Sequence, residues 1–308
     1  MNKDNSDSSI FLSETAVKVC ELPAIFLHNK WNIGRGIDAE SYFSKVNNVE
    51  LYRGEKSGIE FFRPSNIAGD ELFYQKLETH AWYYQENKWE FDVVSKLLAP
   101  EDKLLELGCG TGVFLDKIKD ITRVSRGLEL NNSAALKARA RGLMVTNDSI
   151  LKFAENNIGK YDVVVSFQVM EHIADPLSVL KAQVDCLKSG GKLIISVPNN
   201  DGFYGRSDDV NNFPPHHMVR WNRKALEYLA EEFPLVLEDV KYEPLRKEHL
   251  CMFYRSLFLT WEQAAKLSYF SKACRVLLSR LLMMLFNGLP TKLSGIAGHT
   301  ILAVYRKV

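Results

Sequence analysis

The sequence predicts an α/β fold whose central sheet is doubly wound and mostly parallel, with an antiparallel last strand. From Lys103 onward, apolar runs of strand length alternate with amphipathic segments of helical length, which is typical of parallel strands joined by crossover helices. A glycine-rich loop, Gly108 to Gly112, follows the first of these strands, as it does in Rossmann-like folds. We therefore expect a Rossmann-like doubly wound sheet.

Each element of this sheet is predicted by its own apolar pattern. Residues 161–167, for example, form a valine-rich run of strand length, and residues 175–187 have the apolar spacing of an amphipathic helix. The expected strands are 103–107, 124–130, 143–146, 161–167, 192–197, 235–242 and 300–305, and the expected helices are 112–119, 131–140, 175–187 and 221–232.

Two further regions accompany the sheet. An aromatic-rich stretch occupies residues 26–91, and its apolar spacing from Leu72 to Trp89 predicts one or two helices. An insertion of helical character lies between residues 247 and 293, before the last strand. We expect the chain to divide into an N-terminal extension and lid region (1–92), a core (93–246), and the helical insertion with the last strand (247–308).

The composition is that of an ordinary globular protein, with 46% hydrophobic residues, 25% charged residues and a net charge of +1. The five cysteines are scattered, and no pair has the spacing of a zinc knuckle or a disulfide framework. Residues 1–9 are polar, so we expect them to be disordered and not to form a signal peptide. These features predict a cytoplasmic protein that does not bind nucleic acid.

The charges are unevenly distributed along the chain. Residues 263–308 contain seven basic residues and neither Asp nor Glu. Between residues 263 and 290 the apolar spacing predicts a helix with Lys272 and Arg275 opposite its apolar face. Such a helix can pack on the core, form a homodimer contact, or lie peripherally on an anionic membrane at its inner surface. Its longest apolar run is too short to span a bilayer.

The glycine-rich loop and the acid before it have the properties of a small-molecule site. Gly108 and Gly110 allow a tight turn and the close approach of a ligand. The helix that begins near Gly112 offers unpaired N–H groups to a carboxylate. Glu106, at the end of the preceding strand, can meet an ammonium group directly or through water. A glycine-rich loop alone is a weak signal, because dinucleotide-binding proteins share it.

Polar residues at the ends of the next three strands strengthen this interpretation. Glu129, followed by Leu130, can accept hydrogen bonds from both hydroxyls of a ribose. Asp148 can accept one from an adenine amino group, with Ser149 beside it, and Gln168 follows the fourth strand. An amino-acid group, a ribose and an adenine are the parts of an adenosyl methyl donor.

Together these residues resemble the class I S-adenosylmethionine-dependent methyltransferases. The similar branch comprises ubiquinone-pathway-like O-methyltransferases and small-molecule methyltransferases associated with bacterial polysaccharides. The resemblance implies S-adenosyl-L-methionine as the cofactor and methyl transfer as the activity. It covers about the middle third of the chain and is carried by Glu106 to Gly112, Glu129, Asn147-Asp148, Glu171-His172-Ile173, Asp175-Pro176 and Gly190-Gly191-Lys192.

Other interpretations of these residues remain open. Asp148 and Ser149 can also cap a helix, and Cys109 can be a small packing residue beside the cofactor. The Gly-x-Gly-x-Gly spacing disfavours an NAD-linked dehydrogenase, and the residues after the fourth strand lack the Asn/Asp-Pro-Pro-aromatic pattern of many nucleic-acid methyltransferases. The intact acids and glycines disfavour a scaffold protein that binds the cofactor without turnover.

Three histidines are expected on the substrate side. His172 follows the fourth strand, and His216 and His217 lie in a Pro-Pro-His-His loop after the fifth. Histidine suits the removal of a proton from an acceptor hydroxyl, and we favour His217 because its loop can close over a substrate. Alternatively, His172 holds its own loop by a hydrogen bond, and the pair caps the helix near Trp221. No spacing nominates a third metal ligand, so we expect no metal site.

The acceptor side is less well determined. Tyr83, Tyr84 and Trp89 either form a lid over the sulfonium or belong to a helix packed on the core. The sequence favours a small-molecule O-methyltransferase that acts on a hydroxyl of a sugar or a biosynthetic intermediate. N- or C-methylation of a small molecule and a non-catalytic cofactor-binding scaffold are the alternatives.

Overall fold

The computed structural model describes residues 9–80, 83, 87–265, 277, 281 and 295–308. The predicted disorder of residues 1–8 and nearly all of the predicted 263–290 helix lie outside these residues. Among the described residues, no helix is long and apolar enough to cross a membrane. The last described helix, α10 (Leu250–Ala265), begins inside the predicted insertion.

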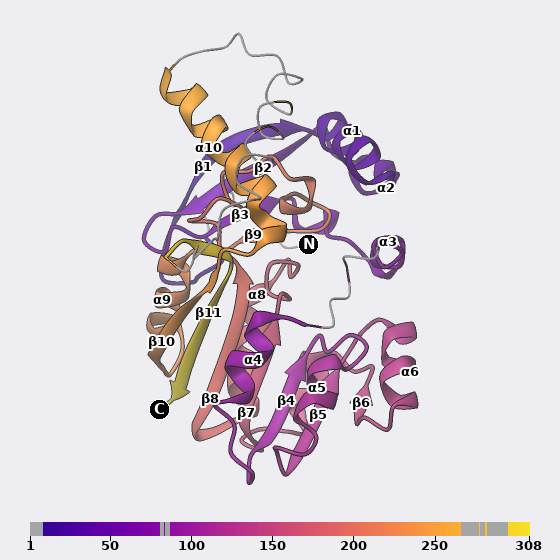
Figure 1. Ribbon diagram of the computed structural model, residues 1–308, viewed down its shortest axis with the longest axis vertical. Helices are drawn as coiled ribbons and strands as arrows, with labels where there is room; N and C mark the ends of the chain where they lie inside the picture. The colour runs from indigo at the N-terminus through magenta and orange to yellow at the C-terminus, as the bar shows by residue number, and fades with distance from the viewer. Residues whose placement is uncertain (1–8, 81–82, 84–86, 266–276, 278–280, 282–294) are drawn as a thin grey trace.

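The core is a seven-stranded sheet, which confirms the predicted fold class (Figure 1). Four neighbouring pairs are parallel, and β11 runs antiparallel to both of its neighbours. The strand order is β10–β11–β8–β7–β4–β5–β6. The strands are β4 (Lys103–Leu107), β5 (Val124–Leu128), β6 (Val145–Thr146), β7 (Tyr161–Phe167), β8 (Leu187–Pro198), β10 (Leu235–Pro244) and β11 (Ala297–Lys307).

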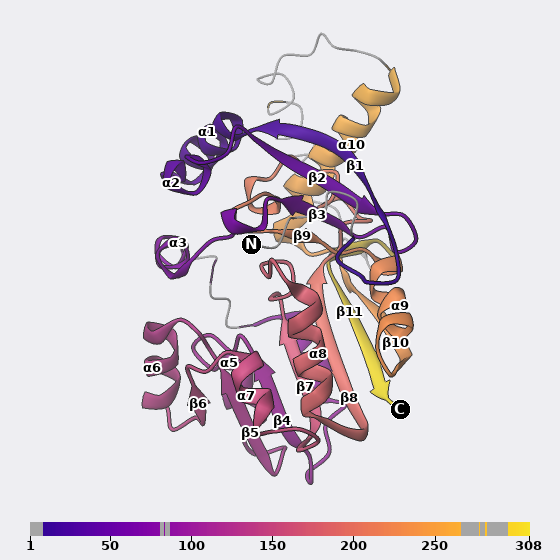
Figure 2. The ribbon, with the colours of Figure 1, turned by 180° about the vertical axis from the view of Figure 1, so that it is seen from behind.

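Helices cover both faces of this sheet, as Figures 1 and 2 show from opposite sides. Three of them share one apolar cluster with the sheet: α4 (Trp89–Ser95), α5 (Val113–Ile118) and α6 (Asn132–Ala140). The other face is covered by α7 (Ile150–Glu155), α8 (Pro176–Cys186) and α9 (Arg223–Glu232). Local sequence determines where such a helix begins. At the start of α8, Asp175 accepts a hydrogen bond from Ser178 N and Pro176 occupies the first turn.

A second, four-stranded sheet lies beyond the carboxyl ends of the core strands (Figure 1). Its order is β1–β2–β3–β9, and all pairs are antiparallel. Its elements are β1 (Ala16–Pro23), β2 (Asn48–Gly54), β3 (Glu60–Arg63) and β9 (Val219–Arg220), accompanied by α1 (Ala24–Arg35), α2 (Glu40–Phe43) and α3 (Glu71–Leu77). We call these elements without β9 the N-terminal layer. Because β9 comes from the chain after β8, the layer is bound directly to the core.

The sequence did not predict this sheet. Its buried residues include Tyr52, Phe61 and Phe62, and they were interpreted only as part of an aromatic-rich region. The apolar spacing from Leu72 to Trp89 predicted one or two helices, and the structure has α3 ending at Leu77 and α4 beginning at Trp89, with no helix among the described residues between them.

Candidate active site

A cavity of about 970 Å³ opens at the carboxyl ends of the core strands, between the sheet and the N-terminal layer. Its size is at the upper end of the range for ligand pockets, so it has room for both a cofactor and an acceptor. Every predicted site residue except Gly112 lines it: Glu106, Gly108, Gly110, Glu129, Leu130, Asp148, Ser149, Gln168, His172, His216 and His217.

The glycine-rich loop turns sharply between β4 and α5. Gly108, Gly110 and Gly112 all have positive φ, which residues with a side chain rarely adopt. A Cβ atom at Gly108 would lie 2.5 Å from Val169 Cγ2, so only glycine fits there. Gly112 instead faces α6 and the residues after it, where a Cβ would lie 2.4 Å from Leu143 Cδ1. Its role is therefore to close the turn and not to line the cavity.

Glu106 is a buried carboxyl group facing the cavity. Its side chain is 3% exposed, and burial raises its pKa to about 8. Its Oε2 atom has no hydrogen-bond partner among the described residues. A buried unpaired carboxyl oxygen is costly, and a ligand ammonium group would supply the missing donor. The site therefore fits the amino group of S-adenosylmethionine.

Glu129 connects the glycine-rich loop to the start of α6. Its Oε2 accepts a hydrogen bond from Gly110 N at 2.8 Å, and its Oε1 accepts one from Asn131 N at 2.7 Å. Burial raises its pKa, although these two bonds favour the ionised form. Each carboxylate oxygen keeps a further lone pair for a ribose hydroxyl. Leu130 is 66% exposed at the rim, where it can pack on an adenine.

Asp148 and Ser149 lie at the far end of the cofactor side. Ser149 caps α7 by accepting a hydrogen bond from Lys152 N, so the helix-capping interpretation holds for this residue. Asp148 forms an ion pair with Lys152 at 3.1 Å and still lines the cavity. The two interpretations of these positions are thus compatible.

Gln168 has φ = 55°, and it is the one residue other than glycine with positive φ among the described positions. Such a conformation costs on the order of 1 kcal/mol for a residue with a side chain. The Gln168 N–H donates to the Ser196 carbonyl at 2.9 Å, which holds the end of β7 against β8. Strained backbone of this kind is often found at functional sites.

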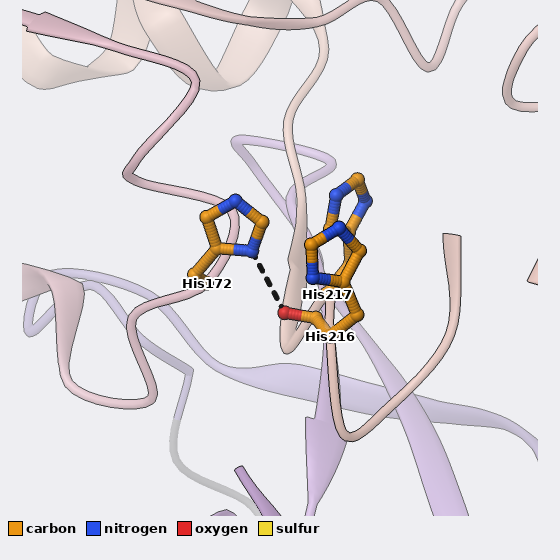
Figure 3. A group of neighbouring side chains, drawn as sticks. All are labelled: His172, His216 and His217. Carbon is orange, nitrogen blue, oxygen red and sulfur yellow. Dashed lines mark hydrogen bonds between the residues drawn. The ribbon is translucent and has the colours of Figure 1, made fainter. Parts of the chain in front are cut away.

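The three predicted histidines form a cluster at the other end of the cavity (Figure 3). The ring centroid of His172 lies 4.4 Å from that of His216 and 5.0 Å from that of His217, and the two neighbours are 4.6 Å apart. His172 Nδ1 donates a hydrogen bond to the His216 carbonyl at 2.9 Å. This bond is the structural role that was expected as an alternative for His172.

The environment of the cluster keeps the imidazoles neutral. Burial lowers the pKa of His172 to about 4 and lowers those of His216 and His217 well below the usual value. His217 Nδ1 lies 3.4 Å from Asn212 Oδ1, which leaves its Nε2 free to accept a proton. A neutral imidazole is the form that a general base requires.

Glu171 is a further site residue. The sequence analysis included it in a motif but predicted no role for its side chain. It is 1% exposed, and burial raises its pKa to about 8. Its Oε1 lies 3.8 Å from His172 Nε2, while its carbonyl accepts hydrogen bonds from Met218 N and Val219 N. Its adjacency to His172 in a Glu-His-Ile motif was the available signal.

The N-terminal layer holds the histidine loop in place. Trp31 Nε1 donates to the Pro214 carbonyl at 2.6 Å, and Gly69 N donates to the Pro215 carbonyl at 2.8 Å. Tyr74 packs its ring edge-on against His172, with centroids 5.6 Å apart. No local pattern in the sequence could indicate these contacts, because they join residues at least 98 positions apart.

The predicted aromatic lid is only partly within the described residues. Tyr83 lines the cavity, whereas Tyr84 lies outside the described part of the chain. Trp89 begins α4 and packs against the core cluster on that face of the sheet, and it does not line the cavity. For Trp89 the packing interpretation therefore holds.

Comparison with known proteins agrees with this geometry. Residues 79–265 match the family model described as "Methyltransferase domain", which is more than half of the chain. The chain belongs to this family. Within it, the predicted recognition is confirmed: the protein is a class I S-adenosylmethionine-dependent methyltransferase, with S-adenosyl-L-methionine as its cofactor.

Among curated proteins, the chain is similar to the ubiquinone biosynthesis O-methyltransferases of Escherichia coli and Escherichia fergusonii. The identity is 31% over 106 residues, which is 32% of this chain and 44% of the relative. The chain thus matches less than half the length of these curated relatives.

Two similar solved structures have low sequence identity. A methyltransferase of Thermotoga maritima, described as a possible histamine N-methyltransferase, is 20% identical with a TM-score of 0.49, over 77% of this chain and 97% of the other. Geranyl diphosphate C-methyltransferase from Streptomyces coelicolor is 16% identical with a TM-score of 0.42, over 70% and 79%.

Proposed function

We propose that this methyltransferase transfers the methyl group of S-adenosylmethionine to a hydroxyl of a small molecule, such as a sugar or a biosynthetic intermediate. The supporting observation is that three neutral imidazoles lie at one end of the cavity whose other end holds Glu106 and Glu129. A hydroxyl is a weak nucleophile that must lose its proton, whereas many amines need no base. The histidine cluster therefore favours an oxygen acceptor.

The cofactor supplies an electrophilic methyl group on a cationic sulfur. Glu106 would hold its ammonium group, Glu129 its ribose, and Asp148 its adenine. Gly108 and Gly110 would let the loop approach it, Gly112 would close the turn, and Leu130, Ser149 and Gln168 would complete the pocket. His217, with His172 and His216 beside it, would take the acceptor proton as the oxygen attacks the methyl carbon and the carbon–sulfur bond breaks.

Several polar side chains line the cavity, and they support a polyhydroxylated substrate. Asp209, Asn211, Arg246 and His299 line it together with the histidine cluster. Their side chains can donate and accept hydrogen bonds to hydroxyl groups, and they enclose a volume suited to a small molecule.

An acceptor screen tests this proposal. We expect release of S-adenosylhomocysteine with sugars or nucleotide sugars, and a product whose new methyl group NMR places on oxygen. The His217→Ala variant controls for hydrolysis of the cofactor in the absence of catalysis. Turnover with amines or carbon acids alone would contradict O-methylation, and cofactor binding without turnover on any acceptor class would favour a scaffold.

We further propose that the divisions 1–92, 93–246 and 247–308 are functional units, with the last unit carrying the 263–290 segment. That segment would support a homodimer or a peripheral contact with the inner membrane surface. Flotation with anionic vesicles at low salt tests the membrane contact. A Lys272/Arg275/Arg280→Glu variant should lose binding, and a wild-type protein that never floats would contradict it.

A further inference from the structure

The histidine cluster has a property that proton transfer alone does not require. One ring nitrogen from each of His172, His216 and His217 lies within 4.8 Å of the other two. In a tetrahedral zinc site with metal–nitrogen distances near 2.0–2.1 Å, ligand nitrogens lie about 3.3 Å apart. Side-chain rotations that move each ring nitrogen by about 1 Å would therefore bring all three nitrogens into the range of one ion.

The hydrogen bonds of the cluster orient two of the rings for this purpose. His172 Nδ1 donates to the His216 carbonyl, and His217 Nδ1 donates to Asn212 Oδ1. A neutral ring whose Nδ1 donates in this way carries its lone pair on Nε2, as in metal-binding histidines whose other nitrogen is hydrogen-bonded. His216 Nδ1 is buried and has no partner among the described residues.

A carboxyl group that can balance the charge of a bound cation lies beside His172. The Glu171 carboxyl group is buried, with Oε1 at 3.8 Å from His172 Nε2 and Oε2 without a partner in the described part of the chain. A cation next to this group would favour its ionised form and would be partly compensated by it. Two buried polar atoms, one on His216 and one on Glu171, thus lack hydrogen-bond partners among the described residues.

The cluster is also accessible from one side. All three histidines and Glu171 line the cavity, so an ion could enter from it and keep an open coordination position there. Imidazole ligands suit zinc, copper, nickel and cobalt, whereas magnesium and calcium prefer oxygen.

We propose that His172, His216 and His217 form a binding site for a divalent transition-metal ion of the zinc type, with Glu171 as the adjacent negative charge. This site does not depend on the proposed O-methylation. The effect of the metal on the reaction rate does depend on that proposed function. An ion bound to these nitrogens occupies the lone pairs that would take the proton of the substrate hydroxyl, so metal binding inhibits methyl transfer.

Cobalt binding tests the site directly. Full-length protein without a histidine tag, treated with a chelator and desalted, is titrated with Co²⁺ and followed by visible absorption. We expect one equivalent to produce bands of a low-coordinate Co²⁺ ion, which Zn²⁺ then displaces. His216→Ala and His217→Ala should each weaken Co²⁺ binding by roughly a hundredfold. His28→Ala removes a histidine of α1 that does not line the cavity, and it should bind Co²⁺ like the wild type.

Cofactor affinity, measured by calorimetry in each variant, shows whether the variants are folded. Absence of Co²⁺ binding by the wild type, or equal binding by folded His216→Ala and His217→Ala variants, would overturn the site. Stimulation of methyl transfer by Zn²⁺ would overturn the inhibitory effect. A protein that binds one Co²⁺ at the cluster but methylates no hydroxyl leaves the site standing and overturns the proposed function instead.

Discussion

The two ends of the cavity are built in different ways. At the cofactor end, Glu106, the glycine-rich loop and Glu129 follow one another along β4, α5 and β5, and their hydrogen bonds join residues at most 20 positions apart. At the histidine end, the loop after β7 meets the loop before β9, and the N-terminal layer holds the latter from outside. A local motif builds the first end, and long-range contacts build the second.

The two ends also differ in charge. Burial raises the pKa values of the carboxyl groups at the cofactor end and lowers those of the imidazoles at the histidine end. Ligand cations restore the ionised carboxylates at one end, while the rings at the other end stay neutral and able to accept protons. Each end therefore matches a different part of the reaction, and the variants below test that separation.

The largest effect is expected at the histidine end. His217→Ala should lower turnover roughly a hundredfold or more with cofactor affinity retained, because it removes the base and leaves the carboxylates in place. Steady-state kinetics and calorimetry measure the two quantities. Near-normal rates in His172→Ala, His216→Ala and His217→Ala alike would leave proximity and orientation as the only sources of catalysis.

At the cofactor end, Glu129→Ala should weaken S-adenosylmethionine binding by about 1–3 kcal/mol, because charge-assisted hydrogen bonds to the ribose are lost. It also removes the acceptor of the Gly110 and Asn131 N–H groups, so the loop should loosen. Calorimetry measures the affinity, with Asp116→Ala, an acid of α5 that does not line the cavity, as the matched control. Equal affinity in the Glu129 variant and the wild type would rule out the ribose assignment.

The pH dependence of cofactor binding should isolate Glu106. In the free protein its pKa is about 8, so the carboxyl group is mostly protonated at neutral pH. Binding an ammonium group needs the ionised form and releases a proton, so affinity should increase by up to about tenfold per unit as the pH rises toward 8. Calorimetry across this range should show the slope in the wild type and its absence in Glu106→Gln. A wild-type affinity that is independent of pH would contradict the assignment.

The smallest effect is expected from the N-terminal layer. Trp31→Phe removes the hydrogen bond to the buried Pro214 carbonyl, which should lower the free energy of unfolding by about 1 kcal/mol. Turnover should fall a few-fold because the histidine loop loses support, while cofactor affinity stays the same. Thermal unfolding and kinetics check both. A variant with the stability and rate of the wild type would show that the layer does not position the histidines.

The sequence predicted the core well because each strand and helix there carries its own apolar period. β4 and β7 have the bounds expected for them, and β8 extends beyond the expected range at both ends, where Leu187 pairs with β7 and Pro198 with β11. The N-terminal sheet was missed although β1 and β2 are longer than β4, and its four-residue strand β3 pairs with β9 far along the chain. A two-residue strand such as β9 is too short to show an alternating pattern of apolar and polar residues.

The sequence by itself determined the cofactor end, since a strand end, a glycine-rich turn and a helix start are local features that act within a few residues. The sequence also predicted the three histidines as site residues. It gave His172 and the pair His216-His217 separately, however, and indicated no third metal ligand to join the pair. Only the tertiary structure decided that His172 lies against His216 and His217, that Glu171 stands beside them, and that Trp31 holds their loop. Those contacts join the loop after β7, the loop before β9 and the N-terminal layer, and the free energy of such packing depends on surfaces that no single segment displays.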